Sequence, residues 1–370
     1  MAQDQRTIGV GIVGSGFISR RYLPNLLRFP HLRVVACADR HPERAAAVAA
    51  EFGVGKAYGV DELLADPEID IVLNLTSPAG HFGIALAAIE AGKAVYNEKP
   101  LAIALDDAQA LLAAAERRRV LMGCAPDTFL GGGLQTCRKL IDDGVIGEPI
   151  AAMAFFGTHG PEHWHPNPAF LYAEGAGPLM DIGPYYLTAL VSLIGPIRRV
   201  TGSARITFPE RVIISEPLHG TVMRVKAPTH VAGILDFSNG AIGTLVTSFD
   251  IWGTTLPRIE LHGTRGSLLV PDPDTFAGPV RLRRAGETEW SDVPLTHSYT
   301  HNARGVGVAD LAHAIQHGRI PRASGALATH ILEALHGIYA GSDNGAHVEI
   351  RTLVERPEPL SAGQPDWELD

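Results

Sequence analysis

Short apolar runs alternate with longer stretches of helical periodicity through the first third of the chain. The apolar runs have the length and β-rich composition of buried strands, and they lie at residues 8–13, 32–38, 69–75, 94–96 and 120–124. The helical stretches between them lie at residues 19–27, 42–51, 61–64, 79–91 and 104–118. Strands that alternate with helices favour a parallel sheet with helices on its faces. We therefore expect a doubly wound α/β domain over residues 1–126.

Strand signals dominate after residue 126. Apolar and polar positions alternate at residues 150–156, 231–237, 241–249, 258–262 and 267–270. The turn Ser238-Asn239-Gly240 joins two of these strands as a hairpin. With late helices at 307–317 and 326–339, this pattern predicts an α+β domain with an antiparallel sheet over residues 127–370. The Pro-rich, acidic tail from Glu355 is expected either to wrap around that domain or to be disordered.

Composition narrows the class of protein. The 370 residues suit two domains, and no apolar run approaches the roughly twenty residues that cross a bilayer, so we expect a soluble protein without a membrane partner. A net charge of −9 and the lack of a basic stripe argue against nucleic-acid binding. The polar stretch at residues 1–7 carries no export signal, and three scattered cysteines (Cys37, Cys124 and Cys137) suit a reducing compartment. We expect a cytoplasmic protein that binds small molecules.

A glycine motif joins the first predicted strand to the first predicted helix. Gly14 permits a tight turn, Gly16 lets the backbone approach a pyrophosphate, and Ser19 stands where a third small residue is expected. The helix N-terminus adds N–H donors and a positive dipole end. Asp39, at the end of the second strand, is placed to bind the adenosine ribose and to repel a ribose phosphate. The pattern predicts a Rossmann domain that prefers NAD, while the neighbouring Arg40 leaves NADP possible.

A lysine follows the fourth predicted strand in the sequence Asn97-Glu98-Lys99-Pro100. Ligands of open α/β sheets bind beyond the carboxyl ends of the strands, so Lys99 is placed to give or take a proton. Oxidation of a secondary alcohol requires removal of the hydroxyl proton, and burial beside a bound cofactor is expected to lower the pKa of Lys99 into the useful range. Taken alone, Lys99 equally suits neutralising Glu98 or binding a phosphate.

Asp181 and Tyr185 form a second candidate pair. Their spacing of four residues places them on one face if both lie in a helix, which we expect to begin near Asp181 or Gly183 because Pro184 is tolerated only in a first turn. Asp181 is a candidate for holding a sugar hydroxyl or orienting the lysine, and Tyr185 for sharing or relaying the proton. A helix cap and a core aromatic are the alternatives.

Four segments, with Asp39, carry a resemblance to a known family: residues 11–18, 77–81, 91–100 and 175–185. The chain resembles the Gfo/Idh/MocA family, named for glucose-fructose oxidoreductase, inositol dehydrogenase and a rhizopine catabolism protein. The resemblance implies a Rossmann domain followed by a domain with a large, open, mainly antiparallel sheet that often forms oligomers, here a homo-dimer or homo-tetramer. It implies a catalytic Lys99 with a cis bond before Pro100, and active-site roles for Asp181 and Tyr185. Tyr185 stands where many relatives have histidine.

The residues expected to contact the cofactor follow the strands of the first domain. They are Gly14, Gly16, Phe17, Ile18, Asp39, Arg40, Thr76, Ser77, Pro78, His81, Glu98 and Lys99. Ser77 and Pro78 suit the N-cap and first residue of a helix, which puts His81 in its first turn near the nicotinamide crevice.

A histidine-rich segment, residues 159–166, precedes the helix of Asp181. Its imidazoles are candidate zinc ligands, but their spacing alone establishes no ligand geometry, and we predict no metal site. We favour sugar recognition, in which Trp164 offers an apolar face and histidines bind hydroxyl groups; plain loop packing fits nearly as well. Arg304 and Asp310 are further cleft candidates that the sequence does not place. The expected substrate-binding residues are Lys99, Asp127, His163, Trp164, His165, Asp181 and Tyr185.

These patterns predict an NAD(P)-dependent oxidoreductase, NAD-preferring, that transfers hydride between the nicotinamide and a secondary alcohol of a sugar, a sugar derivative or a cyclic polyol such as inositol. Two alternatives remain. A glycoside hydrolase or lyase of the same family type would oxidise a ring carbon only transiently and regenerate its NAD. A non-catalytic NAD-binding regulator would bind the cofactor without turnover.

Overall fold

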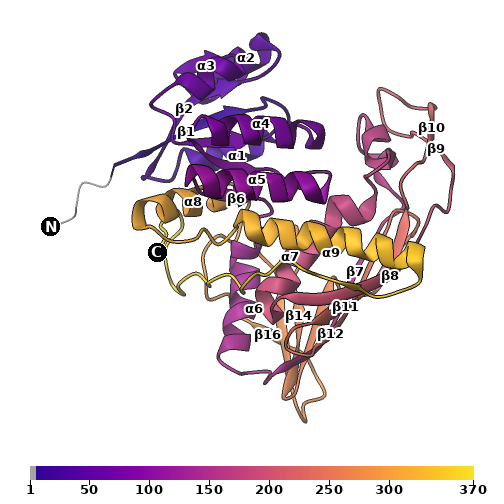
Figure 1. Ribbon diagram of the computed structural model, residues 1–370. Helices are drawn as coiled ribbons and strands as arrows, with labels where there is room; N and C mark the ends of the chain where they lie inside the picture. Colours follow the sequence, from indigo (N-terminus) through magenta and orange to yellow (C-terminus); the bar gives the residue numbers. More distant parts are fainter. Residues whose placement is uncertain (1–5) are drawn as a thin grey trace.

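The computed structural model describes residues 6–370, and it contains two main sheets, one for each half of the chain (Figure 1). The first sheet is parallel, with strand order β3-β2-β1-β4-β5-β6. Its strands are β1 (Ile8–Val13), β2 (Leu32–Ala38), β3 (Lys56–Tyr58), β4 (Ile71–Asn74), β5 (Ala94–Asn97) and β6 (Met122–Cys124). Its helices are α1 (Ser19–Leu26), α2 (Pro42–Phe52), α3 (Val60–Ala65), α4 (Pro78–Glu90) and α5 (Leu105–Arg118). This order confirms the doubly wound Rossmann arrangement, with its switch point between β1 and β4.

The second sheet has nine strands in the order β16-β15-β14-β13-β7-β12-β11-β8-β17. Neighbours are antiparallel except for β7 and β12, which run parallel, so the expected large, mainly antiparallel sheet is confirmed. Its strands are β7 (Pro149–Gly157), β8 (Ile197–Arg205), β11 (His230–Phe237), β12 (Ile242–Ser248), β13 (Ile259–Gly263), β14 (Gly266–Val270), β15 (Val280–Arg284), β16 (Ser291–Val293) and β17 (Val348–Glu349).

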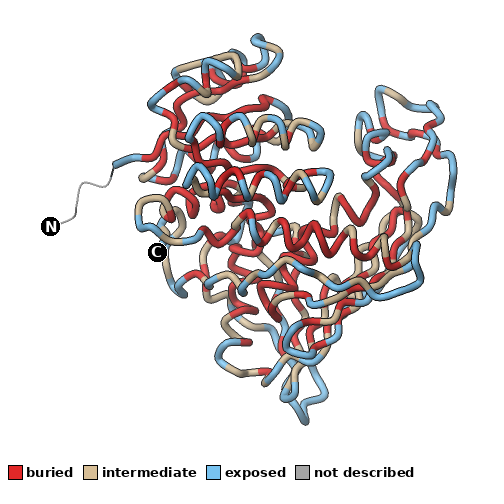
Figure 2. The backbone as a smooth tube through the Cα atoms, in the orientation of Figure 1, coloured by how far each residue is buried: buried red, intermediate tan, exposed pale blue. Residues whose placement is uncertain are grey.

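Helices cover one face of this sheet and leave the other open. α7 (Pro178–Ile194) packs against the central strands β7, β12 and β11, α9 (Gly325–Asn344) packs against α7 and β8, and α6 (Gly132–Asp142) packs against β14 and β15. Residues alternate along the strands, so the open face presents Met153, Ile234 and Ile242 to solvent. α7 is buried almost throughout its length (Figure 2). A helix in that position holds its polar side chains rigidly, which suits an active site.

The start of α7 corrects one expectation. The helix begins at Pro178, three residues before Asp181, and Pro184 therefore lies in its interior instead of its first turn. The sequence Gly177-Pro178 explains the earlier start, because proline is favoured at the first helical position. Asp181 and Tyr185 still share one helix, as predicted.

The carboxy-terminal part of the chain returns to the first domain. α8 (Val306–His317) packs against α1 and β6. In the tail, Trp367 packs edge-on against Phe29 at a ring distance of 5.1 Å, and the Arg28 guanidinium lies 4.0 Å from the Trp367 ring. Of the two outcomes expected for the tail, wrapping is therefore the one observed. The division of the two domains at residues 126 and 127 remains a prediction.

A small lobe projects from the second domain (Figure 1). It contains the 3₁₀ turns η2 (Pro161–His163) and η3 (Pro168–Tyr172) and the two-stranded ribbon of β9 (Glu210–Val212) and β10 (Val222–Arg224). We call residues 158–177 with residues 206–225 the arm lobe. The arm lobe has its own buried cluster, formed by Leu171, Tyr172, Ile213, Met223, Val225 and Phe249. This cluster gives the lobe a core separate from the main one.

Within residues 6–370, every helix is too short or too polar to cross a bilayer. Met1–Gln5, part of the polar stretch on which the expected absence of an export signal rested, lie outside the described residues.

Candidate active site

The glycine loop occupies the switch point between β1 and β4. Gly14 has φ +104°, and a Cβ at this position would lie 2.6 Å from the carbonyl carbon of Leu75, so both backbone conformation and close packing require glycine. Asp39 organises the same loop: one carboxylate oxygen accepts the Ser15 N–H at 2.9 Å and the other accepts the His41 N–H at 2.9 Å. The carboxylate is therefore fixed beside the loop, where a ribose would bind.

The residues around this loop fit a dinucleotide. A Cβ built at Gly16 meets no atom within 4 Å, so the backbone there is open to a ligand. Phe17 is 74% exposed beside it, and the N-terminus of α1 has no side-chain cap; the Arg20 and Arg21 N–H groups donate to the Phe17 and Ile18 carbonyls. A pocket of about 340 Å³ lies between the loop and α2, and Arg20 and Arg44 line it. Arg40, the next residue after Asp39, is exposed.

The segment between β4 and α4 lies at the same edge of the sheet. Ser77 and Pro78 are the N-cap and first residue of α4, as predicted, and the Thr76 hydroxyl donates to the Asn74 side chain at 2.7 Å. His81 is fully buried, with ring nitrogens 2.6 Å from the Pro100 carbonyl oxygen and 3.0 Å from that of Thr76. It ties together the loops that follow β4 and β5, and these contacts give no support to the cofactor-binding role expected for it.

Glu98 uses its carboxylate for hydrogen bonds to other parts of the protein. Its carboxylate accepts the Tyr22 hydroxyl at 2.7 Å and the backbone N–H of Lys99 at 2.8 Å. Its hydrogen bonds therefore go to α1 and the backbone, and the Lys99 ammonium binds elsewhere. The alternative that Lys99 only neutralises Glu98 loses its structural basis.

The Lys99 ammonium reaches across to α7. It donates to the side-chain carboxylate of Asp181 at 2.7 Å and to the main-chain carbonyl of Asp181 at 2.6 Å. The bond before Pro100 is cis, as the resemblance implied. Asp181 lies in the first turn of α7, and it offers Lys99 two acceptors from one residue.

Tyr185 lies beside this ion pair, with its ring centroid 5.1 Å from the Lys99 ammonium. Burial raises the pKa of Tyr185 well above its ordinary value, although Lys99 opposes that shift. Burial by itself lowers the pKa of Lys99, but the charges of Asp181, Tyr185 and Glu98 and the Asp181 hydrogen bond together outweigh it and leave the pKa of Lys99 above its ordinary value. The sequence-based expectation of a lowered pKa concerned a lysine beside bound cofactor, and it left out the carboxylate partner.

Two further charged residues approach Tyr185. The Arg304 guanidinium pairs with the Asp274 carboxylate at 2.6 Å and also reaches the Tyr185 side chain. Burial raises the pKa of Asp274, while Arg304 and Lys99 lower it, so Asp274 belongs to the same electrostatic group. The sequence did not identify Asp274. Its only signal is an acid in the turn Pro271-Asp272-Pro273-Asp274 directly after β14. Tyr185 thus stands between two cations, each with its own carboxylate.

Asp127 and Asp310 have internal partners. Asp127 is buried, and one of its oxygens accepts the N–H groups of Gly305 at 2.8 Å and Gly307 at 3.1 Å, so it caps the start of α8. Asp310 is also buried and pairs with Arg322 at 2.7 Å. These contacts give no support to the substrate-binding role expected for Asp127 or to a place for Asp310 in the cleft.

The expected sugar-recognition residues lie in the arm lobe. Trp164 is 70% exposed, and His163 is exposed beside it. The His165 ring packs edge-on against Trp164 at 5.3 Å. Burial lowers the pKa of His165, while the hydrogen bond with the Asn167 backbone and the Asp181 charge partly oppose this shift.

Comparison with known proteins agrees with this geometry. Residues 8–125 match the sequence model of a family described as an oxidoreductase family with an NAD-binding Rossmann fold, and residues 134–269 match the GFO/IDH/MocA C-terminal domain. The chain is 30% identical over 289 residues to a 1,5-anhydro-D-fructose reductase of Ensifer adhaerens, covering 75% of this chain and 81% of that protein. It is 26% identical over 292 residues to a levoglucosan dehydrogenase of Pseudarthrobacter phenanthrenivorans, covering 71% and 73% of the two chains.

Solved structures share the whole architecture. An NAD binding oxidoreductase from Klebsiella pneumoniae superposes with a TM-score of 0.83 at 25% identity, covering 93% of this chain and 99% of that one. A levoglucosan dehydrogenase in complex with NADH superposes with a TM-score of 0.82 at 21% identity, covering 94% and 100%. At that identity the second similarity shows the fold alone.

Proposed function

Because this chain belongs to the Gfo/Idh/MocA family of NAD-binding oxidoreductases, we propose that it interconverts a secondary alcohol and a ketone on a sugar, a sugar derivative or a cyclic polyol. The observation that carries the proposal is the group formed by Lys99, Asp181 and Tyr185 at the carboxyl edge of the Rossmann sheet. The relatives named as a 1,5-anhydro-D-fructose reductase and a levoglucosan dehydrogenase support a sugar over other alcohols.

Lys99 and Tyr185 handle the proton in this proposal. The bound cofactor supplies or accepts hydride at the carbinol carbon. The substrate oxygen lies between the Lys99 ammonium and the Tyr185 hydroxyl, so that Lys99 polarises it and Tyr185 donates or removes its proton. Asp181 holds the ammonium in place through two hydrogen bonds.

The protonation states favour the reductive direction near neutral pH. Because the pKa of Tyr185 and the pKa of Lys99 both lie above their ordinary values, both groups carry protons at pH 7 in the free protein. A protonated pair is ready to donate to a carbonyl oxygen, whereas oxidation of an alcohol needs one of the groups to lose its proton first. We therefore propose that reduction of a keto sugar is the more efficient direction at neutral pH.

We also propose that Asp39 makes NAD the preferred cofactor. Asp39 is held beside the loop by two backbone N–H groups, where its charge opposes a ribose phosphate. Arg20 and Arg44 line the adjacent pocket, and their positive charge allows NADP to bind as the weaker ligand. Arg20 already pairs with Glu51 at 2.8 Å, which reduces the charge that it offers to a ribose phosphate.

The open face of the nine-stranded sheet supports a homo-oligomer, a dimer or a tetramer. Met153, Ile234 and Ile242 form an apolar centre on that face, which suits contact with a second copy. Size-exclusion chromatography with light scattering would measure the oligomer directly.

Three buried, free cysteines among residues 6–370 support a reducing, cytoplasmic location.

The test of this function is a substrate panel read in both directions. Oxidation of NADH and NADPH is followed at pH 7 with keto sugars, and reduction of NAD and NADP with sugars, glycosides and inositols. The proposal predicts turnover on at least one sugar, with NADH preferred to NADPH. Glycoside cleavage without net NADH formation would instead support transient ring oxidation, and cofactor binding without any turnover would support a regulator.

A further inference from the structure

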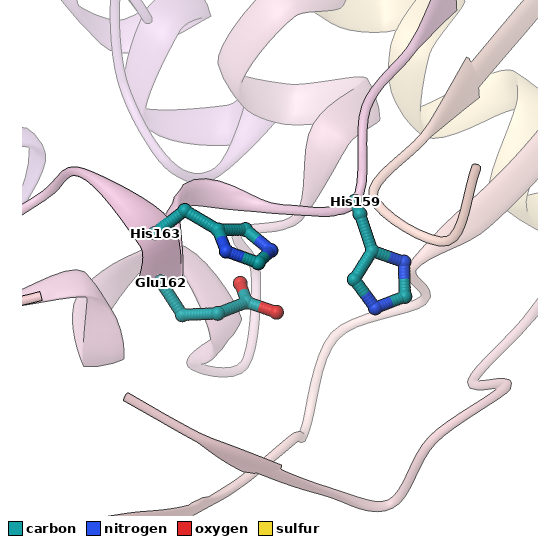
Figure 3. A group of neighbouring side chains, drawn as sticks. All are labelled: His159, Glu162 and His163. Atoms are coloured by element: carbon teal, nitrogen blue, oxygen red, sulfur yellow. The ribbon is translucent and has the colours of Figure 1, made fainter. Parts of the chain in front are cut away.

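Three side chains of the arm lobe meet in a way that the sequence could not show. Glu162 and His163 lie in η2, and His159 lies two residues beyond the end of β7. One ligand atom from each residue lies within 4.8 Å of the other two. Figure 3 shows the two imidazole rings and the carboxylate facing a common space. Two imidazoles and one carboxylate form a common ligand set for divalent transition metals.

The charge beneath these side chains favours a cation. Arg211 pairs with both Glu162 and Asp250, and all three side chains are buried. One guanidinium against two carboxylates leaves a net charge of about −1 inside the lobe, which is costly unless a further positive charge compensates it. The Asp250 carboxylate has one more neutral donor, the Thr229 hydroxyl at 2.8 Å. A cation at His159 and His163 would balance the remaining charge.

The hydrogen bonds of Glu162 are compatible with metal binding. Its two oxygens accept from Arg211 and from the Tyr172 hydroxyl. Each carboxylate oxygen has a second lone pair, and metal-ligating carboxylates in proteins are usually hydrogen-bonded in this way, which orients them. Arg211 and Tyr172 therefore act as supports that fix the direction of the carboxylate.

The two imidazoles are available as ligands. Within residues 6–370, no side chain makes a hydrogen bond to the ring of His159 or His163. His159 is held by stacking on Trp252, with ring centroids 3.4 Å apart, and Asp250 backbone lies within reach of its ring. Among the described residues, the buried Nδ1 atom of His159 has no hydrogen-bond partner, which leaves it open to an ion.

We propose that His159, Glu162 and His163 bind one divalent transition-metal ion, with Zn²⁺ the best match to this ligand set. Three protein ligands leave a fourth position for water or a ligand oxygen, and His163 is exposed, so solvent can reach the ion. The nitrogen ligands disfavour Ca²⁺ and Mg²⁺, which prefer oxygen ligands throughout. The ion would join η2 to the end of β7 and stiffen the arm lobe. This site is independent of the proposed oxidoreductase activity.

The test is a metal titration of the full-length protein after treatment with a chelator. Isothermal calorimetry with Zn²⁺ is expected to show one saturable site per chain, and Co²⁺ is expected to give visible absorption bands that Zn²⁺ abolishes. His163→Ala changes an exposed side chain and should fold, and it is expected to weaken Zn²⁺ binding at least tenfold. His159→Ala should do the same.

The matched control is His165→Ala, which removes a histidine of the same segment outside the group. Its Zn²⁺ affinity is expected to match that of the unaltered protein. The proposal is overturned if the unaltered protein shows no saturable site, if His163→Ala binds Zn²⁺ as tightly as the unaltered protein, or if His165→Ala loses as much affinity as His163→Ala. The Co²⁺ spectrum distinguishes a bound site from surface adsorption.

Discussion

The Lys99 ammonium and the Asp181 residue are joined by two hydrogen bonds, one to the side-chain carboxylate and one to the main-chain carbonyl. Lys99 follows β5 of the first domain, and Asp181 lies in α7 of the second. This pair therefore exists only while the two halves of the chain are packed together. Substituting Asp181 removes the carboxylate but keeps the main-chain carbonyl, so the buried ammonium loses its charged partner.

Tyr185→Phe tests the role of the phenol. Removing one positioned acid is expected to lower kcat by about 10²–10⁴-fold with little change in KM, because the ring still packs in α7. Steady-state kinetics in the reductive direction measure this effect. Tyr185→His, which restores a group that transfers protons, is expected to recover part of the activity. A kcat for Tyr185→Phe within threefold of the unaltered value would exclude Tyr185 as the acid.

The pH dependence should differ between the two directions. Because the pKa of Tyr185 and that of Lys99 lie above their ordinary values, the protonated pair persists from neutral into alkaline pH. We expect the reduction rate to be flat from pH 6 to about 9 and the oxidation rate to rise throughout, by up to about tenfold per pH unit, as the base form becomes populated. A plateau of the oxidation rate below pH 8 would contradict this assignment.

Arg304→Met tests whether the Arg304 and Asp274 pair positions Tyr185. Removing a cation beside the phenol makes its deprotonated form less favourable, so the rise of oxidation with pH should move to higher pH by about one unit. Arg304→Lys keeps the charge and should restore most of the profile. Stopped-flow or steady-state kinetics of oxidation across pH 7–10 measure this shift. An unchanged pH profile in Arg304→Met would assign Arg304 a purely structural role.

Asp39→Ala tests cofactor choice. The substitution removes the acceptor of two loop N–H groups and the charge that opposes a ribose phosphate. We expect the Kd for NADH to rise about tenfold, roughly 1.4 kcal/mol, and the preference for NADH over NADPH to shrink or reverse. Fluorescence titration measures both affinities, with the exposed helix residue Asp106 changed to Ala as the control. An unchanged ratio of affinities would remove Asp39 from cofactor selection.

Asp127→Asn tests how titration of the buried Asp127 carboxyl changes the free energy of unfolding with pH. Burial raises the pKa of Asp127 to about 6, while the N–H groups of Gly307 and Gly305 oppose the shift. A carboxyl with a raised folded pKa stabilises the fold fully below its unfolded pKa and loses that contribution as pH rises to about 6. Between pH 3 and 7 the unaltered protein should lose about 3 kcal/mol relative to Asp127→Asn. Urea unfolding across this range gives the difference, and parallel curves would contradict it.

Regular elements and their motifs were predictable, because their signals are local. The apolar runs and the four-residue spacing of Asp181 and Tyr185 lie within single elements, and Gly14 and Lys99 lie in the loops directly after β1 and β5. The direction of a side chain was not predictable in the same way. His81 begins α4 as expected, but its ring turns inward because two main-chain carbonyls from different loops converge on it.

The sequence did not identify Asp274, and it named Arg304 as a cleft candidate without placing it, because the two residues meet only through tertiary packing. Asp274 and Arg304 are thirty residues apart and belong to turns without periodicity, yet their pair completes the surroundings of Tyr185. The helix start at Pro178 was missed for a related reason, because Pro184 suggested a first turn and only packing on the sheet stabilises a helix with proline in its interior.

Lys99→Met tests most directly whether the Lys99 ammonium acts on the substrate oxygen. The variant keeps the length and volume of the side chain and removes its charge, and Lys139→Met, which changes an exposed lysine of α6, is the control. With the substrate found in the panel, kcat/KM should fall at least about 10²-fold in Lys99→Met while the Kd for NADH stays within threefold. A folded, NADH-binding Lys99→Met that keeps more than a tenth of the kcat/KM of the unaltered protein would contradict the account.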